Sequence, residues 1–418
     1  MQTQSKPQNH LLFIDGLRAL AAIYVVMHHA MLQYYDPETS HLKGFYEFNL
    51  TGVKRIIIAL LAQGHYAVNL FIVLSGYSLM LSVTRNNYTL KGGTITFFQR
   101  RVIRILPPYY ISILFSLLLI TWLIGQKTGL HWDVSIPVTR QDIIYHLVLI
   151  HDFFISSSLR INHVLWSVAV EFRIYLFFPL LVFIWKKAGV LPAILLSITI
   201  SALGTLIFYF GTIQNPNLNL RFPGVSPFII LFTLGMLAAD IAFSSRQYAT
   251  AIRSALVNTK GLKYAVAIVV ISIVVLLKFF AKSDNLVLIH LFNNLLDVVI
   301  GILFALFLVI CSLTDNTGKT IWITHILSWR PLVFVGTFSF SLYLVHAPLL
   351  QILSQYFLAP FQLDIFSASM VLVVFGTIAM ILISYVFFLA FERPFLNLGK
   401  KTGAMVTAPT TPANKQLT

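Results

Sequence analysis

The stretch that decides the fold runs from Phe13 to His29 and reads FIDGLRALAAIYVVMHH. It is apolar over a length that can cross a bilayer, yet it contains Asp15, Arg18 and a histidine pair. Eleven steps of about 100° bring His29 back to within about 20° of Arg18, whereas His28 lies about 80° off that stripe. Ionisable groups inside a bilayer are costly unless they face a partner or a wet cavity. The stripe therefore predicts a protein interior that uses these groups.

The composition of the whole chain is that of a polytopic membrane protein. Hydrophobic residues make up 58% of the 418 residues, charged residues 10%, and the mean hydropathy is +0.83. These values lie far from the usual globular mix, and they predict an all-α protein whose helices span the membrane. Cys311 is the only cysteine, so neither an intramolecular disulfide nor a cysteine metal site can form, and no metal is expected.

Ten apolar runs are long enough to cross about 30 Å of hydrocarbon. They lie near residues 11–33, 65–83, 103–125, 164–185, 189–211, 225–243, 262–281, 288–313, 331–357 and 367–391. Residues 141–155 are too short and polar for a confident further span, and they favour an amphipathic or re-entrant element. The expected organisation is a cytoplasmic segment at 1–10, one membrane domain at 11–396 and a disordered cytoplasmic tail at 397–418.

The positive charge is mainly a topology signal. With both termini in the cytoplasm, most lysines and arginines fall in inner segments, including the run around Arg100 to Arg104. The positive-inside rule favours this orientation, and contact with anionic membrane lipids is a second use of the charge. Nucleic acid is a poor explanation of the net charge of +15.

Three titratable side chains are expected at similar depth. Helix rise places His29 about 20 to 27 Å, and His346 about 22 Å, above the cytoplasmic starts of their spans. Glu171 enters from the outside and lies about 7 Å below its outer end. A shared site is one interpretation. The alternative is that Glu171 pairs with Arg173 or another cation as a packing contact, and that His346 is a hydrogen-bonded core histidine.

A second cluster is expected at the cytoplasmic mouth of the third span. Arg101 and Arg104 are three residues apart on a helix, and Arg100 and Arg104 are four apart, so the three guanidinium groups can converge on a multiply charged anion such as a phosphate. The alternative is a lipid-headgroup anchor, which accounts less naturally for Arg104 inside the apolar run.

Taken together, the motifs resemble those of the acyltransferase 3 family, in the order in which that family carries them. The matching stretches cover residues 11 to about 396: the Asp15–His29 stretch, VNLFIVLSGY at 68–77, the arginine run into Pro107, WSVAVE at 166–171, FSFSLYLVH at 338–346 and ERPF at 392–395. Asn69 stands where an acidic residue is frequent in the family, and Arg173 stands where the family often has a polar or acidic residue.

The resemblance implies an integral membrane enzyme that transfers an acyl group, commonly acetyl, from acyl-coenzyme A. The acceptor would be a hydroxyl of a sugar, surface polysaccharide, glycolipid or small natural product, and the protein a multi-pass protein of the inner (plasma) membrane. Arg18 and His29 correspond to the family's essential pair, and Arg100, Arg101 and Arg104 to its donor-binding motif. The acceptor, the acyl length and the oligomeric state stay open.

The chemistry suits these residues independently. Acyl transfer to a hydroxyl needs a general base, for which a histidine is suitable, so His29 is the candidate. Asp15 lies about 21 Å from His29 along the same helix and fits better as the partner of Arg18. Glu171 is therefore the preferred group to orient His29, with His346 or a cation stabilising the oxyanion. A transporter or flippase is the main alternative, and a sensor or scaffold is a weaker one.

The topology can be tested with single cysteines in a Cys311→Ala background. A cysteine at Asn86 should be shielded from an impermeant thiol reagent in intact cells, because the charge bias places that loop inside. Cysteines at Thr39 and Asn217 should be labelled. Labelling at Asn86 with protection at the other two positions would reverse the orientation.

Overall fold

A computed structural model describes residues 11–34, 52–220, 224–258, 271, 286–316 and 322–399. Within these ranges the fold is helical, without a β-strand beyond an isolated bridge between Phe154 and Leu218. The helices are α1 (Leu12–Leu32), α3 (Gly52–Leu61), α4 (His65–Thr84), α5 (Gly93–Leu119), α6 (Arg140–Leu147), α7 (Trp166–Lys187), α8 (Val190–Gln214), α9 (Phe228–Phe243), α10 (Gln247–Asn258), α12 (Leu286–Asn316), α13 (Trp322–Leu327), α14 (Arg330–Thr337), α15 (Ser339–Ile352), α16 (Ile365–Val371) and α17 (Thr377–Phe387).

Several helices continue through irregular turns. π-Helical turns follow α5 at Ile120–Ile124, α15 at Leu353–Leu358, α16 at Leu372–Gly376 and α17 at Phe388–Glu392, and short 3₁₀ turns lie at His131–Ser135, His151–Phe153 and Ala359–Phe361. With these turns included, eight described helices are long and apolar enough to cross a membrane, and the bent pair α9–α10 could make a ninth. The all-α polytopic class is thus confirmed.

The spans differ from the sequence expectation in three places. The run at 262–281 lies almost entirely outside the described residues. The run at 225–243 forms α9, which is only 16 residues long and meets α10 at a bend of 80°. The run at 331–357 is broken between α14 and α15, because Phe338 adopts a non-helical backbone (φ −123°, ψ 20°).

Two predicted boundaries also shift. Helix α5 begins at Gly93, so the arginine run lies inside a helix about two turns from its start. The last described helical segment ends at Gly399, so the expected disordered tail cannot begin at 397; residues 400–418 lie outside the described part of the chain. Residues 141–155 form the short helix α6 and a 3₁₀ turn, and they do not form a span.

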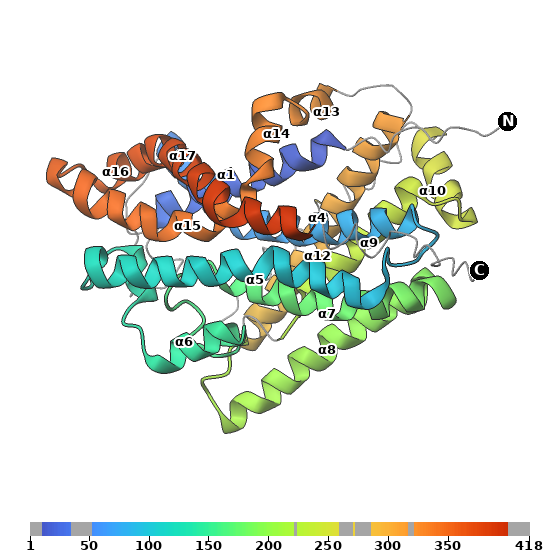
Figure 1. The fold of residues 1–418 in the computed structure, drawn as a ribbon, viewed down its shortest axis with the longest axis horizontal. Coiled ribbons are helices and arrows are strands. Elements are labelled where there is room, and N and C mark those ends of the chain that lie inside the picture. The colour runs from blue at the N-terminus through green and yellow to red at the C-terminus, as the bar shows by residue number, and fades with distance from the viewer. Residues whose placement is uncertain are drawn as a thin grey trace, which may run out of the picture.

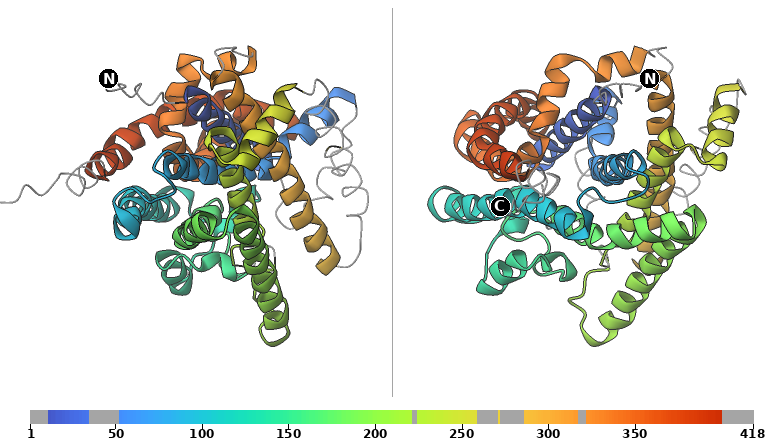
Figure 2. Two further views of the ribbon diagram at one scale, coloured as in Figure 1. Left: turned by 90° about the vertical axis from the view of Figure 1, so that its right-hand side faces the viewer. Right: turned by 45° about the vertical axis from the view of Figure 1, so that its right-hand side comes forward.

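The neighbours of helix α1 come from both ends of the chain (Figure 1). It packs against α3 and α4 and against the helices from α13 to α17. Most of its first half is buried, including Phe13, Ala19 and Ala22, whereas Leu12 and Leu20 are exposed. By contrast, α8 extends away from the body and exposes most of its leucine, isoleucine and phenylalanine side chains (Figure 2). This helix has the surface expected of a helix that faces lipid.

Glycine permits the closest helix crossing. A Cβ on Gly76 of α4 would lie 2.0 Å from the carbonyl oxygen of Phe232, and one on Gly235 of α9 would lie 2.0 Å from that of Val73. Small residues at such crossings let backbones approach closely, which is the main source of packing where lipid removes the hydrophobic driving force. The crossing fixes α4 against α9.

Side-chain contacts give the relative directions of the helices around the site. Helices α1 and α15 run parallel, because His29 meets His346 and, farther along both helices, Gln33 meets Gln351. Helices α4 and α7 also run parallel to each other, because His65 stacks on Trp166 near their starts and Ser75 bonds to Glu171 farther along. Helix α4 runs antiparallel to α1, since Arg18 near the start of α1 bonds to Ser78 near the end of α4. Helix α7 is therefore antiparallel to α15.

Candidate functional site

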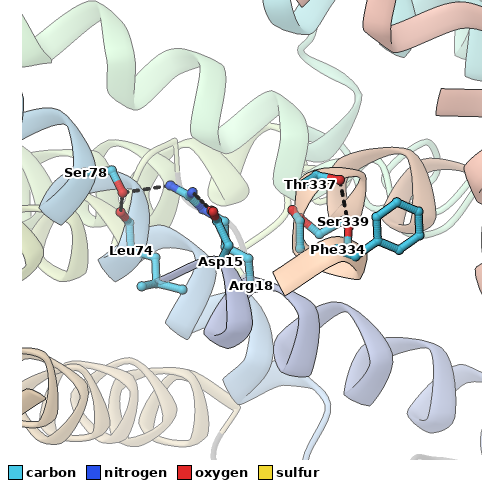
Figure 3. Close-up of polar contacts among 8 residues, drawn as sticks. Asp15, Arg18, Leu74, Ser78, Phe334, Thr337 and Ser339 are labelled. Carbon is cyan, nitrogen blue, oxygen red and sulfur yellow. Dashed lines mark hydrogen bonds and ion pairs between the residues drawn. The ribbon is translucent and has the colours of Figure 1, made fainter. Parts of the chain in front are cut away.

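The ionisable stripe of α1 begins with an ion pair. The Arg18 guanidinium lies 2.9 Å from the Asp15 carboxylate and donates a second hydrogen bond of 2.7 Å to Ser78 Oγ on α4 (Figure 3). The pairing of Asp15 with Arg18 at three residues' spacing is confirmed. Because Asp15 is bound here, it plays no part in orienting His29.

A cavity of about 320 Å³ opens beside Arg18 and gathers four arginines. Arg100, Arg101 and Arg104 of α5 join Arg18 in its wall, together with side chains from α4, α7 and α15. Arg101 also lies against two aromatic rings, those of Phe97 and Tyr175, at 5.7 and 5.6 Å from their centroids. The expected convergence of the three α5 arginines is present, and the sequence did not indicate that Arg18 faces the same cavity.

These arginines are under-neutralised. The Nε atoms of Arg100 and Arg101 are buried without a hydrogen-bond partner among the described residues. Among the described carboxylates, that of Asp15 forms an ion pair with one of the four guanidinium groups, the guanidinium of Arg18. Buried guanidinium donors are normally satisfied, so the cavity is suited to an anion with several oxygen acceptors.

Glu171 lies on this side of the bundle rather than beside His29. Its carboxylate accepts a hydrogen bond of 2.8 Å from Ser75 Oγ and another from the Tyr175 hydroxyl, and it lines the arginine cavity. Ser167, one turn before it, bonds to Tyr343, one turn before His346. Since α7 and α15 are antiparallel, Glu171 and His346 are about 10 Å apart in depth. We expected Glu171 to contact and orient His29. Its carboxylate instead contacts the hydroxyls of Ser75 and Tyr175, at a different depth of the bundle from the histidine pair.

Arg173 does not bind Glu171 either. It forms an ion pair and two hydrogen bonds with Asp152 of the segment that follows α6, and its guanidinium also donates to the Leu149 carbonyl. The packing contact considered for Glu171 is thus made by a different pair of residues.

His29 and His346 form a direct pair. His29 Nδ1 lies 3.0 Å from His346 Nε2, while His346 Nδ1 lies 2.8 Å from the Tyr343 carbonyl and 3.1 Å from that of Leu342. A carbonyl only accepts, so we assign the His346 proton to Nδ1, which leaves its Nε2 as an acceptor for the proton on His29 Nδ1. His29 Nε2 then carries the lone pair. The arrangement gives His29 the tautomer that a general base needs.

The segment between α5 and α7 adds two histidines that the sequence reasoning missed. The rings of His163 and His131 lie 5.0 and 6.5 Å from that of His29. His163 Nδ1 lies 3.2 Å from Ser135 Oγ, whereas its Nε2 is buried with no partner among the described residues. Burial and the neighbouring His131 hold the pKa of His163 well below its usual range. The polar character of the residues between the third and fourth spans was the sequence feature that could have indicated these two histidines.

His28 bonds to a different partner, although its ring centroid lies 5.1 Å from that of His29. Its Nδ1 lies 2.8 Å from the Leu61 carbonyl at the end of α3, which agrees with its position off the stripe. No group of three described His, Cys, Asp or Glu side chains has the geometry to hold a metal ion.

A carboxylate from α12 stands beside Asn69. Asn69 Nδ2 donates to Asp297 at 2.8 Å, and His65 Nε2 lies 2.9 Å from the same carboxylate. The chain therefore places an acid next to the position where the family often has one, although it comes from another helix.

Comparison with known proteins agrees with the motif order. The family profile described as an acyltransferase domain matches residues 11–389. The peptidoglycan O-acetyltransferase of Listeria monocytogenes is 25% identical over 355 residues, which cover 81% of this chain and 49% of that protein. A Staphylococcus aureus (strain COL) relative with the provisional name of O-acetyltransferase is 25% identical over 377 residues, covering 85% of this chain and 53% of the relative. The chain thus spans about half the length of these relatives. No solved structure gives a significant match.

The segment that carries His131 and His163 should loosen in acid. Within the same segment, the rings of His146 and His151 stack with their centroids 3.7 Å apart; burial lowers the pKa of His146 to about 4 and that of His151 well below its usual range. Lowered histidine pKa values stabilise the fold above about pH 6.5, and this stability is lost as the pH falls, at up to about 1.4 kcal/mol per pH unit for each histidine. Burial raises the pKa of Asp152 to about 6, which acts in the opposite sense but is one group against two.

We therefore expect the apparent Tm of purified protein to fall between pH 7 and pH 5. His151→Phe should flatten this dependence, because one of the two titrating groups is removed while the stacked ring is kept. A His325→Phe variant, which changes a histidine of α13 outside this segment, serves as the control and should keep the wild-type slope. An unchanged slope in His151→Phe would contradict the assignment.

Proposed function

Because the chain belongs to the acyltransferase 3 family, we propose that it transfers an acyl group, in the first instance acetyl, from cytosolic acyl-coenzyme A to a hydroxyl of a carbohydrate on the outer side of the membrane. Peptidoglycan is the acceptor that the name of the Listeria monocytogenes relative gives for that protein, and it supports a surface polysaccharide as the acceptor class here.

The observation that carries this proposal is the position of the His29–His346 pair next to Tyr343, a side chain of the arginine cavity wall. Tyr343 lines that cavity, and its ring centroid lies 5.9 Å from the ring of His346. A base and an anion site therefore follow one another along the bundle axis. In a membrane, this arrangement lets a donor enter from one side and an acceptor from the other.

The arginines suit the phosphates of coenzyme A. Arg100, Arg101 and Arg104 project from one helix, Arg18 faces them from α1, and two buried Nε donors still need acceptors. Charge-assisted bonds from guanidinium forks to phosphate oxygens are short and directional. With the phosphates held there, the pantetheine arm extends along the cavity and brings the thioester to the end that lies nearest the histidines, beside Tyr343.

The transfer itself needs one proton acceptor and a stabilised oxyanion. His29 Nε2 removes the proton of the acceptor hydroxyl as its oxygen attacks the thioester carbonyl carbon. The tetrahedral intermediate collapses with cleavage of the carbon–sulfur bond, and the proton held by His29 is returned to the departing thiolate. His346 accepts the His29 Nδ1 proton in a hydrogen bond and so keeps the second nitrogen basic, which is the task of the carboxylate in a catalytic triad.

Glu171 belongs to the part of the proposed site that binds the acyl donor. Its carboxylate holds Ser75 and Tyr175, and the Tyr175 ring lies against Arg101. We assign it to positioning the arginine wall rather than to proton transfer. The transporter alternative gains no support, because the relatives named above are acetyltransferases.

The assignment of the base can be tested by substitution. His29→Ala should lower the rate of acyl transfer by about 10²-fold or more, as expected for loss of a general base. His346→Gln should have a smaller effect that shifts the pH–rate profile, because only the orientation and basicity of His29 change. His28→Ala is the matched control and should stay near the wild-type rate. Consumption of acetyl-coenzyme A by purified protein, with mass spectrometry of surface glycans as the product assay, measures all three variants.

The donor site can be tested by binding. Arg101→Ala and Arg104→Ala should each weaken binding of acetyl-coenzyme A, by up to about 3 kcal/mol for a lost charge-assisted bond. Arg393→Ala, an arginine in the last described helical segment that does not line the cavity, is the control. Wild-type affinity of the Arg101→Ala/Arg104→Ala double variant by calorimetry would restore the lipid-anchor interpretation.

A further inference from the structure

Tyr343 connects the wall of the arginine cavity to the histidines. Tyr343 lines the cavity, while neither His29 nor His346 does. His346 lies three residues farther along α15, and its ring is in contact range of the Tyr343 ring, with 5.9 Å between the centroids. Tyr343 itself is buried, with 7% of its surface exposed. An acyl group that reaches His29 from the cavity therefore meets this ring first.

The ring is held rigidly in that position. Its hydroxyl donates to the Val164 carbonyl at 2.8 Å and lies 2.6 Å from Ser167 Oγ. Both partners belong to the start of α7 and the turn before it, and both are buried. Two hydrogen bonds at the far end of an aromatic side chain fix its direction, because its remaining freedom is two torsions already constrained by packing.

Phe71 of α4 supports the ring from the side. The two rings meet edge to face, with centroids 6.1 Å apart and an interplanar angle of 74°, and Phe71 lines the same end of the cavity as Val68. Edge-to-face aromatic pairs are favoured beyond their buried area, so the pair forms a stable wall. We call Tyr343 and Phe71 the end wall.

The chemical character of the cavity changes toward this wall. The four arginines lie at the other end, and the polar side chains between them and the wall include Glu171 and its two hydroxyl partners, Ser75 and Tyr175. At the wall itself the lining is apolar or aromatic, apart from Ser167, whose hydroxyl is already bonded to Tyr343. Such a surface suits a short hydrocarbon group and offers nothing to a charged one.

We propose that the end wall of Tyr343 and Phe71 sets the length of the acyl group that the cavity accepts, and that it restricts the donor to the shortest chains, with acetyl as the best fit. This proposal rests on the proposed function, since it concerns the acyl end of the same donor. With the phosphates fixed at the arginines, each added methylene has to be placed against a ring that two hydrogen bonds prevent from yielding. Longer acyl chains are therefore excluded by shape.

The test compares binding of free coenzyme A, acetyl-coenzyme A and butyryl-coenzyme A to the purified full-length chain by calorimetry. Wild-type protein should bind butyryl-coenzyme A more weakly than acetyl-coenzyme A. In Tyr343→Ala the butyryl donor should bind more tightly than the acetyl donor. The ratio of the two affinities should shift by at least about tenfold, because each of the two added methylenes, once buried in the space left by the ring, raises the affinity about fourfold. Tyr343→Phe keeps the ring but removes both hydrogen bonds that hold it, so its ratio should lie between those of the wild type and Tyr343→Ala.

Leu342→Ala is the matched control. Leu342 precedes Tyr343 on α15, is fully buried at 0% exposure and does not line the cavity. It should lower stability as a core truncation does, yet leave the ratio between the two acyl donors unchanged. If Tyr343→Ala does not fold, Phe71→Ala opens the other half of the end wall and should shift the ratio in the same direction.

The outcomes separate the two proposals. Absence of coenzyme A binding in the wild type would overturn the proposed function, whatever the acyl chain. Wild-type binding of coenzyme A together with equal affinity for acetyl and butyryl donors would overturn the end wall alone. An unchanged ratio in both folded wall variants would do the same.

Discussion

The structure depends on the cost of placing charge and hydrogen-bonding groups where there is no water. Each ionisable side chain in the bundle interior needs a partner, and the partners that α1 finds determine how the helices around it are arranged. Arg18 is held by Asp15 on its own helix and by Ser78 on α4. Farther along the same helix, His29 is held by His346 on α15. These contacts tie α1 to α4 and to α15, and they place a cationic cavity and a histidine pair on one helix face.

The two ends of this face differ in the chemistry of their polar groups. At the histidine end, a chain of hydrogen bonds runs from backbone carbonyls through His346 to His29 and leaves one basic nitrogen. At the arginine end, two buried guanidinium Nε atoms have no partner among the described residues. In a bundle whose other polar groups are mostly bonded, a donor without an acceptor marks a place for a ligand. The separation of the two ends suits a reaction whose substrates arrive from opposite sides of a membrane.

The segment between α5 and α7 contributes to the histidine end of this face, although it is not part of a membrane-spanning helix. Its own contacts are dense: Arg173 of α7 binds Asp152, Arg160 donates to the carbonyls of Val134 and Ile136, and Asn162 donates to Leu344 on α15. A polar connection of this length would be flexible without them. Anchored in this way, it brings His131 and His163 to the ring of His29, as part of the site rather than as a loop over it.

The sequence by itself determined the class of the protein and the residues of the first helix that matter. Composition and hydropathy predict an all-α membrane protein, and the spacing of Asp15, Arg18 and His29 predicts their common face, because both depend only on local chemistry and helix geometry. Arg100, Arg101 and Arg104 could be predicted to converge for the same reason.

The partners of these residues were decided by the tertiary structure alone. Depth counted from helix ends placed Glu171 beside His29, but the contact between Ser167 and Tyr343 sets a register of α7 against α15 in which its carboxylate lies about 10 Å from the depth of His346, among hydroxyls and arginines. The break at Phe338, the approach of His131 and His163, and the position of Tyr343 between cavity and histidines also depend on how separate segments pack. A one-dimensional pattern gives the height and the face of a side chain on its own helix. It does not say which helix stands opposite, because that is set by close packing over the whole bundle.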